Sequence, residues 1–151
     1  MRFMLIDGNS LTYRAFHALP TDLVTASGQV TNAVFGFTSM FINLVRDHQP
    51  DAIAVAFDRP EKTFRHDRDP EYKANRIAAP DILRQQLPLV RQVVDTLGVT
   101  AIEKVGVEAD DIIATFATLA AARGDDVLIV TGDRDSYQLV EDPHIRVIYN
   151  K

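Results

Sequence analysis

Short apolar runs alternate with longer amphipathic stretches along this chain of 151 residues. Runs of four to six apolar residues are typical of buried strands, and apolar positions at helical spacing indicate helices. The predicted strands lie near 2–6, 52–57, 127–131 and 145–149, with a weaker one near 99–103, and the predicted helices lie over 32–47, near 81–97 and near 109–123. This alternation predicts an α/β fold with a mostly parallel central sheet and helices on both faces.

Acidic residues follow three of the predicted strands and open one of the predicted helices. The carboxyl ends of parallel strands share one edge of a sheet, where such folds bind their ligands. The acidic residues expected there are Asp7, Asp58, Glu108, Asp110, Asp111, Asp133 and Asp135. Carboxylates crowded in this way repel one another unless a cation lies among them, and oxygen ligands suit Mg²⁺ or Mn²⁺. The sequence therefore predicts metal ions held against a phosphodiester.

Composition narrows the kinds of site that the chain can build. It has 46% hydrophobic and 25% charged residues, which is typical of a globular protein, and the apolar run needed to span a membrane is missing. The first residues lead directly into a strand rather than a signal peptide, which favours the cytoplasm. The chain has no cysteine and only four scattered histidines. Thiolate and zinc sites are therefore disfavoured, and a metal here is expected to be held by oxygen.

The formal net charge of −5 hides an uneven distribution of charge along the chain. Leaving out the seven predicted ligands changes the net charge to +2. Six of the sixteen Lys and Arg residues fall within 59–76, namely Arg59, Lys62, Arg65, Arg68, Lys73 and Arg76. This segment has two prolines and almost no apolar periodicity, so it is either a solvated loop or a flexible segment over the site. Tyr72, Lys73 and Arg76 favour the second interpretation, because they combine a stacking face with two phosphate-pairing cations.

Six short motifs follow one another along the chain between residues 7 and 135. They are Asp7-Gly8-Asn9-Ser10, Tyr13-Arg14-Ala15-Phe16-His17, Phe57-Asp58, Tyr72-Lys73-Ala74-Asn75-Arg76, Gly106-Val107-Glu108-Ala109-Asp110-Asp111 and Thr131-Gly132-Asp133-Arg134-Asp135. In this order they closely resemble the 5′ nuclease domain at the amino terminus of bacterial DNA polymerase I, a flap endonuclease-like 5′-3′ exonuclease. Each motif alone is weak evidence for this resemblance, but the last two motifs together are highly specific for it.

The resemblance implies a PIN-like 5′ nuclease fold with the basic segment as an arch over the active site. It implies metal-dependent cleavage of DNA flaps and 5′ ends, and of RNA primers, in replication and repair near the nucleoid. In the family, the seven acidic positions contact Mg²⁺ or Mn²⁺, with two ions in the complete domain. Lys73 and Arg76 match positions that approach the scissile phosphate, and Arg14 and Tyr72 match positions expected to contact the substrate.

One departure from the family concerns length. The family domain normally continues past the equivalent of Lys151, with a further Asp-containing segment and a helix-hairpin-helix element that grips duplex DNA. Neither is present here, nor is the covalently linked polymerase portion. The chain is therefore expected to be the amino-terminal part of a 5′ nuclease domain, and a poor nuclease by itself.

Other interpretations stay open. Asp7 and Asp58 are also explained as polar strand ends, and acids at the start of a helix are favourable without a metal. Asp133 and Asp135 have local explanations as turn and helix-cap residues. A PIN-type ribonuclease, a phosphatase and a non-catalytic DNA-binding module are the alternative classes. A phosphatase with an aspartyl nucleophile is disfavoured, because it needs a second Asp two residues after Asp7, where the chain has Asn9. Tyr13 and Phe16 are expected to pack the first helix.

Overall fold

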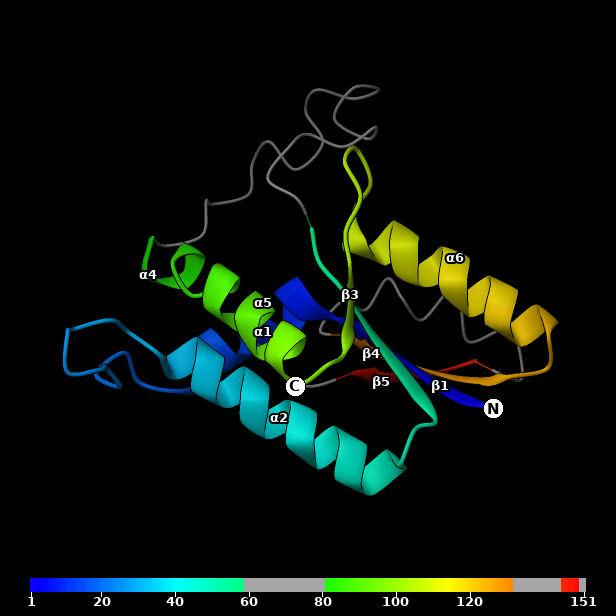
Figure 1. Ribbon diagram of the computed structural model, residues 1–151, viewed down its shortest axis with the longest axis horizontal. Helices are drawn as coiled ribbons and strands as arrows, with labels where there is room; N and C mark the ends of the chain where they lie inside the picture. The colour runs from blue at the N-terminus through cyan, green and yellow to red at the C-terminus, as the bar shows by residue number, and fades with distance from the viewer. Residues whose placement is uncertain (59–80, 132–144, 150–151) are drawn as a thin grey trace.

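A single five-stranded parallel sheet forms the centre of the molecule in a computed structural model, which describes residues 1–58, 81–131 and 145–149 (Figure 1). The strands are β1 (Arg2–Asp7), β2 (Ala52–Ala56), β3 (Thr100–Ile102), β4 (Asp126–Thr131) and β5 (Ile145–Tyr149). The helices are α1 (Gly8–Ala18), α2 (Asn32–His48), α4 (Asp81–Arg84), α5 (Leu87–Thr96) and α6 (Ala109–Ala122). The strand order is β3-β2-β1-β4-β5, so all five predicted strands are confirmed.

The middle strand, β1, pairs with β2 on one side and with β4 on the other. Ile6 pairs with Val55 of β2 on one side and with Val130 of β4 on the other, and all three residues are fully buried. Continuous apolar runs are expected for strands that are covered on both faces. The parallel register brings the carboxyl ends of β1, β2 and β4 to the same edge.

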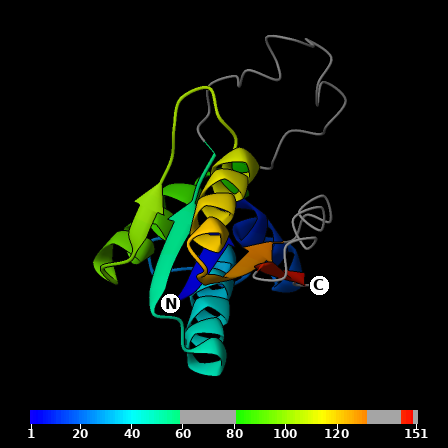
Figure 2. The ribbon, with the colours of Figure 1, turned by 90° about the vertical axis from the view of Figure 1, so that its right-hand side faces the viewer.

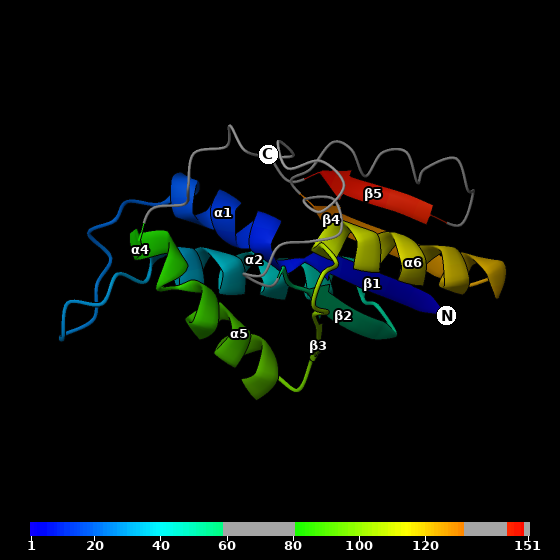
Figure 3. The ribbon, with the colours of Figure 1, turned by 90° about the horizontal axis from the view of Figure 1, so that it is seen from above.

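Helices cover both faces of the sheet, as predicted (Figures 2 and 3). On one face α6 packs its small and branched side chains, including Ile113 and Ala117, against β1, β2 and β4. On the other face α1, α2 and α5 pack against the strands through residues such as Leu11, Phe37 and Val90. In the part of the chain that the structure describes, no helix combines the length and the apolar character needed to cross a membrane.

The prediction of one continuous helix near 81–97 was wrong. The chain forms the short helix α4, turns at Gln85 and Gln86, and starts α5 at Leu87. Pro88 explains the break, because proline has no N–H to donate and its ring crowds the carbonyl four residues earlier, but it fits the first turn of a new helix. The turn also leaves the side chain of Gln86 completely buried.

The predicted helix over 32–47 is confirmed as α2, but not all of its apolar side chains are buried. Phe37 and Phe41 are buried against the sheet, but Phe35 is 60% exposed and Ile42 is 55% exposed. Residues seven apart lie on the same side of a helix, so Phe35 and Ile42 share the outer face of α2. In α1, Phe16 packs in the core as expected, whereas Tyr13 is 51% exposed. Helical spacing alone therefore overestimated the buried surface of both helices.

Candidate metal centre at the carboxyl edge of the sheet

Asp7 occupies the junction between β1 and α1, with no loop between the two elements. Its backbone is extended and its Oδ1 atom accepts a hydrogen bond from the N–H of Ser10 at 3.1 Å, so it is the N-cap of α1. The residue is only 5% exposed. A carboxylate is favourable at a helix N-terminus, which gives Asp7 a structural role in addition to the predicted metal contact.

Asp58 lies just after β2, the strand next to β1, and connects two helices. Its backbone N–H donates to Oδ1 of Asn9 at 3.0 Å, in the first turn of α1. Its own Oδ1 accepts from the N–H of Ala109 at 2.6 Å, at the start of α6. Figure 1 shows the carboxyl end of β2 beside the N-terminal end of α6. The hydrogen bond spans 51 residues of sequence and brings Asp58 next to the predicted acidic cluster.

The acidic cluster opens α6 as the sequence predicted. Glu108 is the N-cap residue and is 7% exposed, but its side chain makes no capping hydrogen bond. Asp58 provides a side-chain acceptor for the first N–H of the helix instead. Asp110 and Asp111 lie half-buried in the first turn, where negative charge stabilises a helix.

Phe57 fixes the backbone immediately before Asp58. Its N–H donates to the carbonyl of Ile102 at 2.8 Å, and its ring is buried. A Cβ atom added to Gly8 would lie 2.5 Å from Cε1 of this ring, so only glycine allows the observed approach. The Arg91 guanidinium carbon lies 5.4 Å from the ring centroid, within cation–π distance, and Nη1 of Arg91 pairs with Glu103 at 3.1 Å.

The structure therefore places part of the predicted set of acids at one edge of the sheet. Asp7, Asp58 and the Glu108 cluster come from three elements that meet at the carboxyl edge of the sheet. Arg14 lies on α1, half-buried and about two turns after Asp7. The remaining predicted residues, namely Tyr72, Lys73, Arg76, Asp133 and Asp135, lie outside the described residues.

Carboxylate oxygens are the ligands that Mg²⁺ and Mn²⁺ prefer, so the donor set at this edge fits such a cation in type. Within residues 1–58, 81–131 and 145–149, however, no three or more His, Asp or Glu side chains form a group that could hold a metal ion. The described acids alone do not complete a metal site. The assignment of the seven acids as ligands stays a prediction.

Sequence reasoning missed two residues of this edge, Gly8 and Asn9. Both lie in the Asp7-Gly8-Asn9-Ser10 motif, but their contacts are to residues about 50 positions away. The signal that could have found them is their position directly after a strand-end aspartate, where a helix begins against the neighbouring strand.

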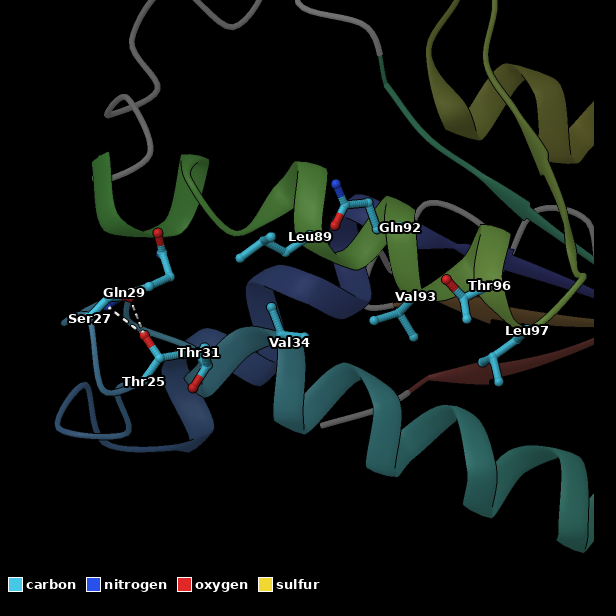
Figure 4. A pocket seen from close by; sticks show the side chains of 10 residues that line it. All are labelled: Thr25, Ser27, Gln29, Thr31, Val34, Leu89, Gln92, Val93, Thr96 and Leu97. Atoms are coloured by element: carbon cyan, nitrogen blue, oxygen red, sulfur yellow. Dashed lines mark hydrogen bonds between the residues drawn. The ribbon is translucent and has the colours of Figure 1, made fainter.

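A depression of about 560 Å³ lies elsewhere, between α5, the start of α2 and the segment before it (Figure 4). Oγ1 of Thr25 lies 2.9 Å from Oγ of Ser27 and accepts from the N–H of Gln29 at 3.2 Å on one side of it. It is lined by Thr25, Ser27, Gln29, Thr31, Val34, Leu89, Gln92, Val93, Thr96 and Leu97. None of these side chains is ionisable in the neutral pH range, so the depression offers neither metal ligands nor acid–base groups.

A parallel α/β sheet with carboxylates at its carboxyl edge defines a class of proteins that bind ligands at that edge. Comparison with known sequences identifies the family within this class. Residues 2–151 match the family described as the 5′-3′ exonuclease, N-terminal resolvase-like domain. The chain belongs to this family, which confirms the resemblance inferred from its motifs.

Its relatives are DNA polymerase I proteins. The chain is 53% identical over 147 residues to the DNA polymerase I of Mycobacterium bovis, covering 97% of this chain and 16% of the relative. It is 43% identical over 150 residues to that of Bacillus caldotenax, covering 99% of this chain and 17% of the relative. The chain thus spans about a sixth of the length of these relatives.

Solved structures share the fold. The T5 5′-exonuclease with bound zinc aligns with a TM-score of 0.70 at 21% identity, over 99% of this chain and 55% of that chain. A T5 flap endonuclease in a complex with DNA and metal ions gives a TM-score of 0.70 at 19% identity, over 99% and 55%. The catalytic core of Rad2 with a DNA substrate gives 0.51 at 15% identity, over 89% and 40%. At these identities the alignments establish that the fold is shared, with its sheet and helices.

Proposed function

We propose that this chain provides the metal-binding part of a 5′ nuclease that hydrolyses phosphodiester bonds at DNA 5′ ends and flaps and in RNA primers. The observation that carries the proposal is the hydrogen bond from the Ala109 N–H to Asp58, because it joins two separate acidic stretches at one sheet edge. The family match over residues 2–151 supports a nuclease. The DNA and metal ions in a T5 flap endonuclease structure and the DNA substrate in a Rad2 structure support the substrate and the cofactor.

The seven acids would hold Mg²⁺ or Mn²⁺, with two ions in the complete domain. Bound divalent cations of this kind activate a water molecule and stabilise the leaving oxygen of a phosphodiester. The chain's own cations have a separate task. Lys73 and Arg76 would stabilise the charge that develops on the phosphate oxygens, and Arg14 and Tyr72 would hold the strand by charge and stacking. No protein nucleophile is required.

The polymerase portion, the DNA and the RNA primer belong to the same proposal. Relatives about six times longer carry the name DNA polymerase I, which supports a covalent link to a polymerase in the full-length protein. Removal of RNA primers and repair of nicked DNA are the steps in which a 5′ nuclease next to a polymerase is useful, and both take place in the cytoplasm at the nucleoid.

The test is cleavage by the full-length protein with Mn²⁺ of two substrates, a 5′-flap DNA and a single-stranded RNA of equal length. We expect rapid cleavage at the base of the flap and loss of cleavage when the metal is chelated. Cleavage of the RNA alone would instead identify a PIN-type ribonuclease. Binding of the flap without cleavage would identify a DNA-binding module, and either result would contradict the proposal.

The roles of Lys73 and Arg76 are tested by single-turnover cleavage. A cation aimed at the scissile phosphate acts mainly on the transition state, so Lys73→Ala and Arg76→Ala should slow cleavage about 100-fold or more with a much smaller loss of DNA affinity. Arg65→Ala, in the same basic segment, is the matched control and should change the rate less than about three-fold. Loss of affinity alone in both variants would make these residues ordinary phosphate contacts.

A further inference from the structure

Asn9 makes a hydrogen bond that the proposed function does not explain. It lies half-buried in the first turn of α1, and its side-chain Oδ1 accepts the backbone N–H of Asp58 at 3.0 Å. An amide has no charge with which to attract a cation strongly, and Asn9 is not among the seven predicted ligands. Its contact is to the backbone of one of them.

The position of Asp58 explains why such a contact matters. β2 ends at Ala56, and the N–H of Phe57 still bonds to the carbonyl of Ile102. Asp58 is the next residue, where the ladder with β3 has ended. Its N–H is taken by the Asn9 side chain instead of by a strand. The Asn9 amide therefore extends the ordered backbone of β2 by one residue, to the acid itself.

The side chain of Asp58 is held as well as its backbone, by a hydrogen bond from α6. Oδ1 accepts the N–H of Ala109, and among the described residues Oδ2 of Asp58 makes no hydrogen bond or ion pair that the structure records. Asp58 as a residue is exposed to solvent. One side chain on α1 and one peptide of α6 thus fix Asp58 at two points and leave one oxygen available for a cation.

We propose that Asn9 is a positioning residue, which holds Asp58 so that its second carboxylate oxygen faces the metal site. This inference rests on the proposed function for the identity of the ligand, but the positioning itself is a property of the hydrogen bonds. Partners that orient metal ligands through hydrogen bonds typically change metal affinity 10–100-fold when they are removed.

The experiment measures amide hydrogen exchange by NMR in metal-free buffer and Mn²⁺ affinity by calorimetry, on the full-length protein or on its nuclease portion if that folds alone. Asn9→Ala removes the acceptor and should speed exchange of the Asp58 and Ala109 amides at least ten-fold. The amide of Phe41 in α2 should exchange at its original rate, which separates local release from global destabilisation. Mn²⁺ affinity should fall about ten-fold.

Two variants serve as controls. Asn43→Ala makes the same chemical change on the exposed face of α2 and should alter neither measurement. Asn9→Asp keeps an acceptor oxygen of the same shape and should restore protection of the Asp58 and Ala109 amides. Failure of this rescue would contradict the role of the acceptor.

The two proposals fail in different ways. If Asn9→Ala leaves both amides protected and Mn²⁺ affinity within two-fold of the original, Asn9 does not position Asp58. If the unmodified protein binds no Mn²⁺, the proposed function is overturned together with the purpose of the contact. The exchange rates would then still establish or overturn the positioning of Asp58 by Asn9.

Discussion

The two ends of α1 carry two different polar clusters. At its N-terminus lie Asp7, Asn9 and Asp58, which include two carboxylates, and Asp58 is exposed to solvent. At its C-terminus Asn32 and Gln86 form an amide cluster that is neutral and fully buried. The first cluster contains the carboxylates of the proposed metal site, whereas the second contains only amides that bond to one another and to the backbone.

The amide cluster satisfies its groups internally. Nδ2 of Asn32 donates to the carbonyls of Phe16 and Leu19, and Nε2 of Gln86 donates to Oδ1 of Asn32 and to the carbonyl of Ile82. Oε1 of Gln86 accepts two N–H groups from the first turn of α2, from Ala33 at 2.8 Å and Val34 at 3.2 Å. Two side chains thus cap the C-terminal end of α1 and the N-terminal end of α2, and they join both helices to α4.

The comparison predicts that Gln86→Ala has the largest effect on stability. It leaves buried donors and acceptors of Asn32, Ala33 and Ile82 without partners, which should lower the free energy of unfolding by roughly 3–5 kcal/mol. Urea denaturation measures the effect. The neighbouring Gln85 is exposed, and Gln85→Ala should change stability by less than about 0.5 kcal/mol. Mn²⁺ affinity of the folded protein should be unchanged in both variants.

Gly8→Ala should affect stability and the metal site together. The added methyl group would lie 2.5 Å from the ring of Phe57, so the ring and the Asp58 backbone after it must shift. Overpacking of this kind costs about 1–3 kcal/mol. Urea denaturation and Mn²⁺ titration should both show a loss. Phe57→Leu in the same chain should recover part of the stability, and a purely additive double variant would contradict the close contact.

Two substitutions of Asp58 distinguish its capping of α6 from its proposed role in metal binding. Asp58→Asn keeps an oxygen for the Ala109 N–H, so stability should change by less than about 1 kcal/mol, whereas Asp58→Ala also removes the cap and should cost about 0.5–2 kcal/mol more. Both variants should bind Mn²⁺ at least ten-fold more weakly. Equal Mn²⁺ affinity in Asp58→Asn and the unmodified protein would leave Asp58 with a structural role only.

Local pattern predicted the fold well, because burial on both faces of a parallel sheet produces apolar runs that are visible in the sequence. The strand-end position of Asp7 and the start of α6 at Glu108 followed from the same pattern. The pattern could not predict the roles of Gln86 and Asn9, because these depend on partners far away in the sequence. Gln86 is buried because Asn32 and α2 satisfy its amide, and Asn9 matters because β2 ends beside it.

The outward face of α2 shows a second limit. Phe35 and Phe37 have identical side chains, but Phe37 is fully buried and Phe35 is largely exposed. Their difference arises from the side of α2 that meets the sheet, which hydrophobicity alone does not specify. The same limit applied to the break before Pro88, where a continuous apolar spacing concealed two helices.

We propose that the carboxyl edge of the sheet binds divalent cations through its aspartates. Calorimetric titration of the protein with Mn²⁺ tests it directly, with Asp7→Asn as the variant and Asp22→Asn, an exposed aspartate in the segment before α2, as the control. We expect saturable binding that Asp7→Asn weakens at least ten-fold and Asp22→Asn leaves unchanged. Absence of saturable binding, or equal affinity in all three proteins, would contradict the claim.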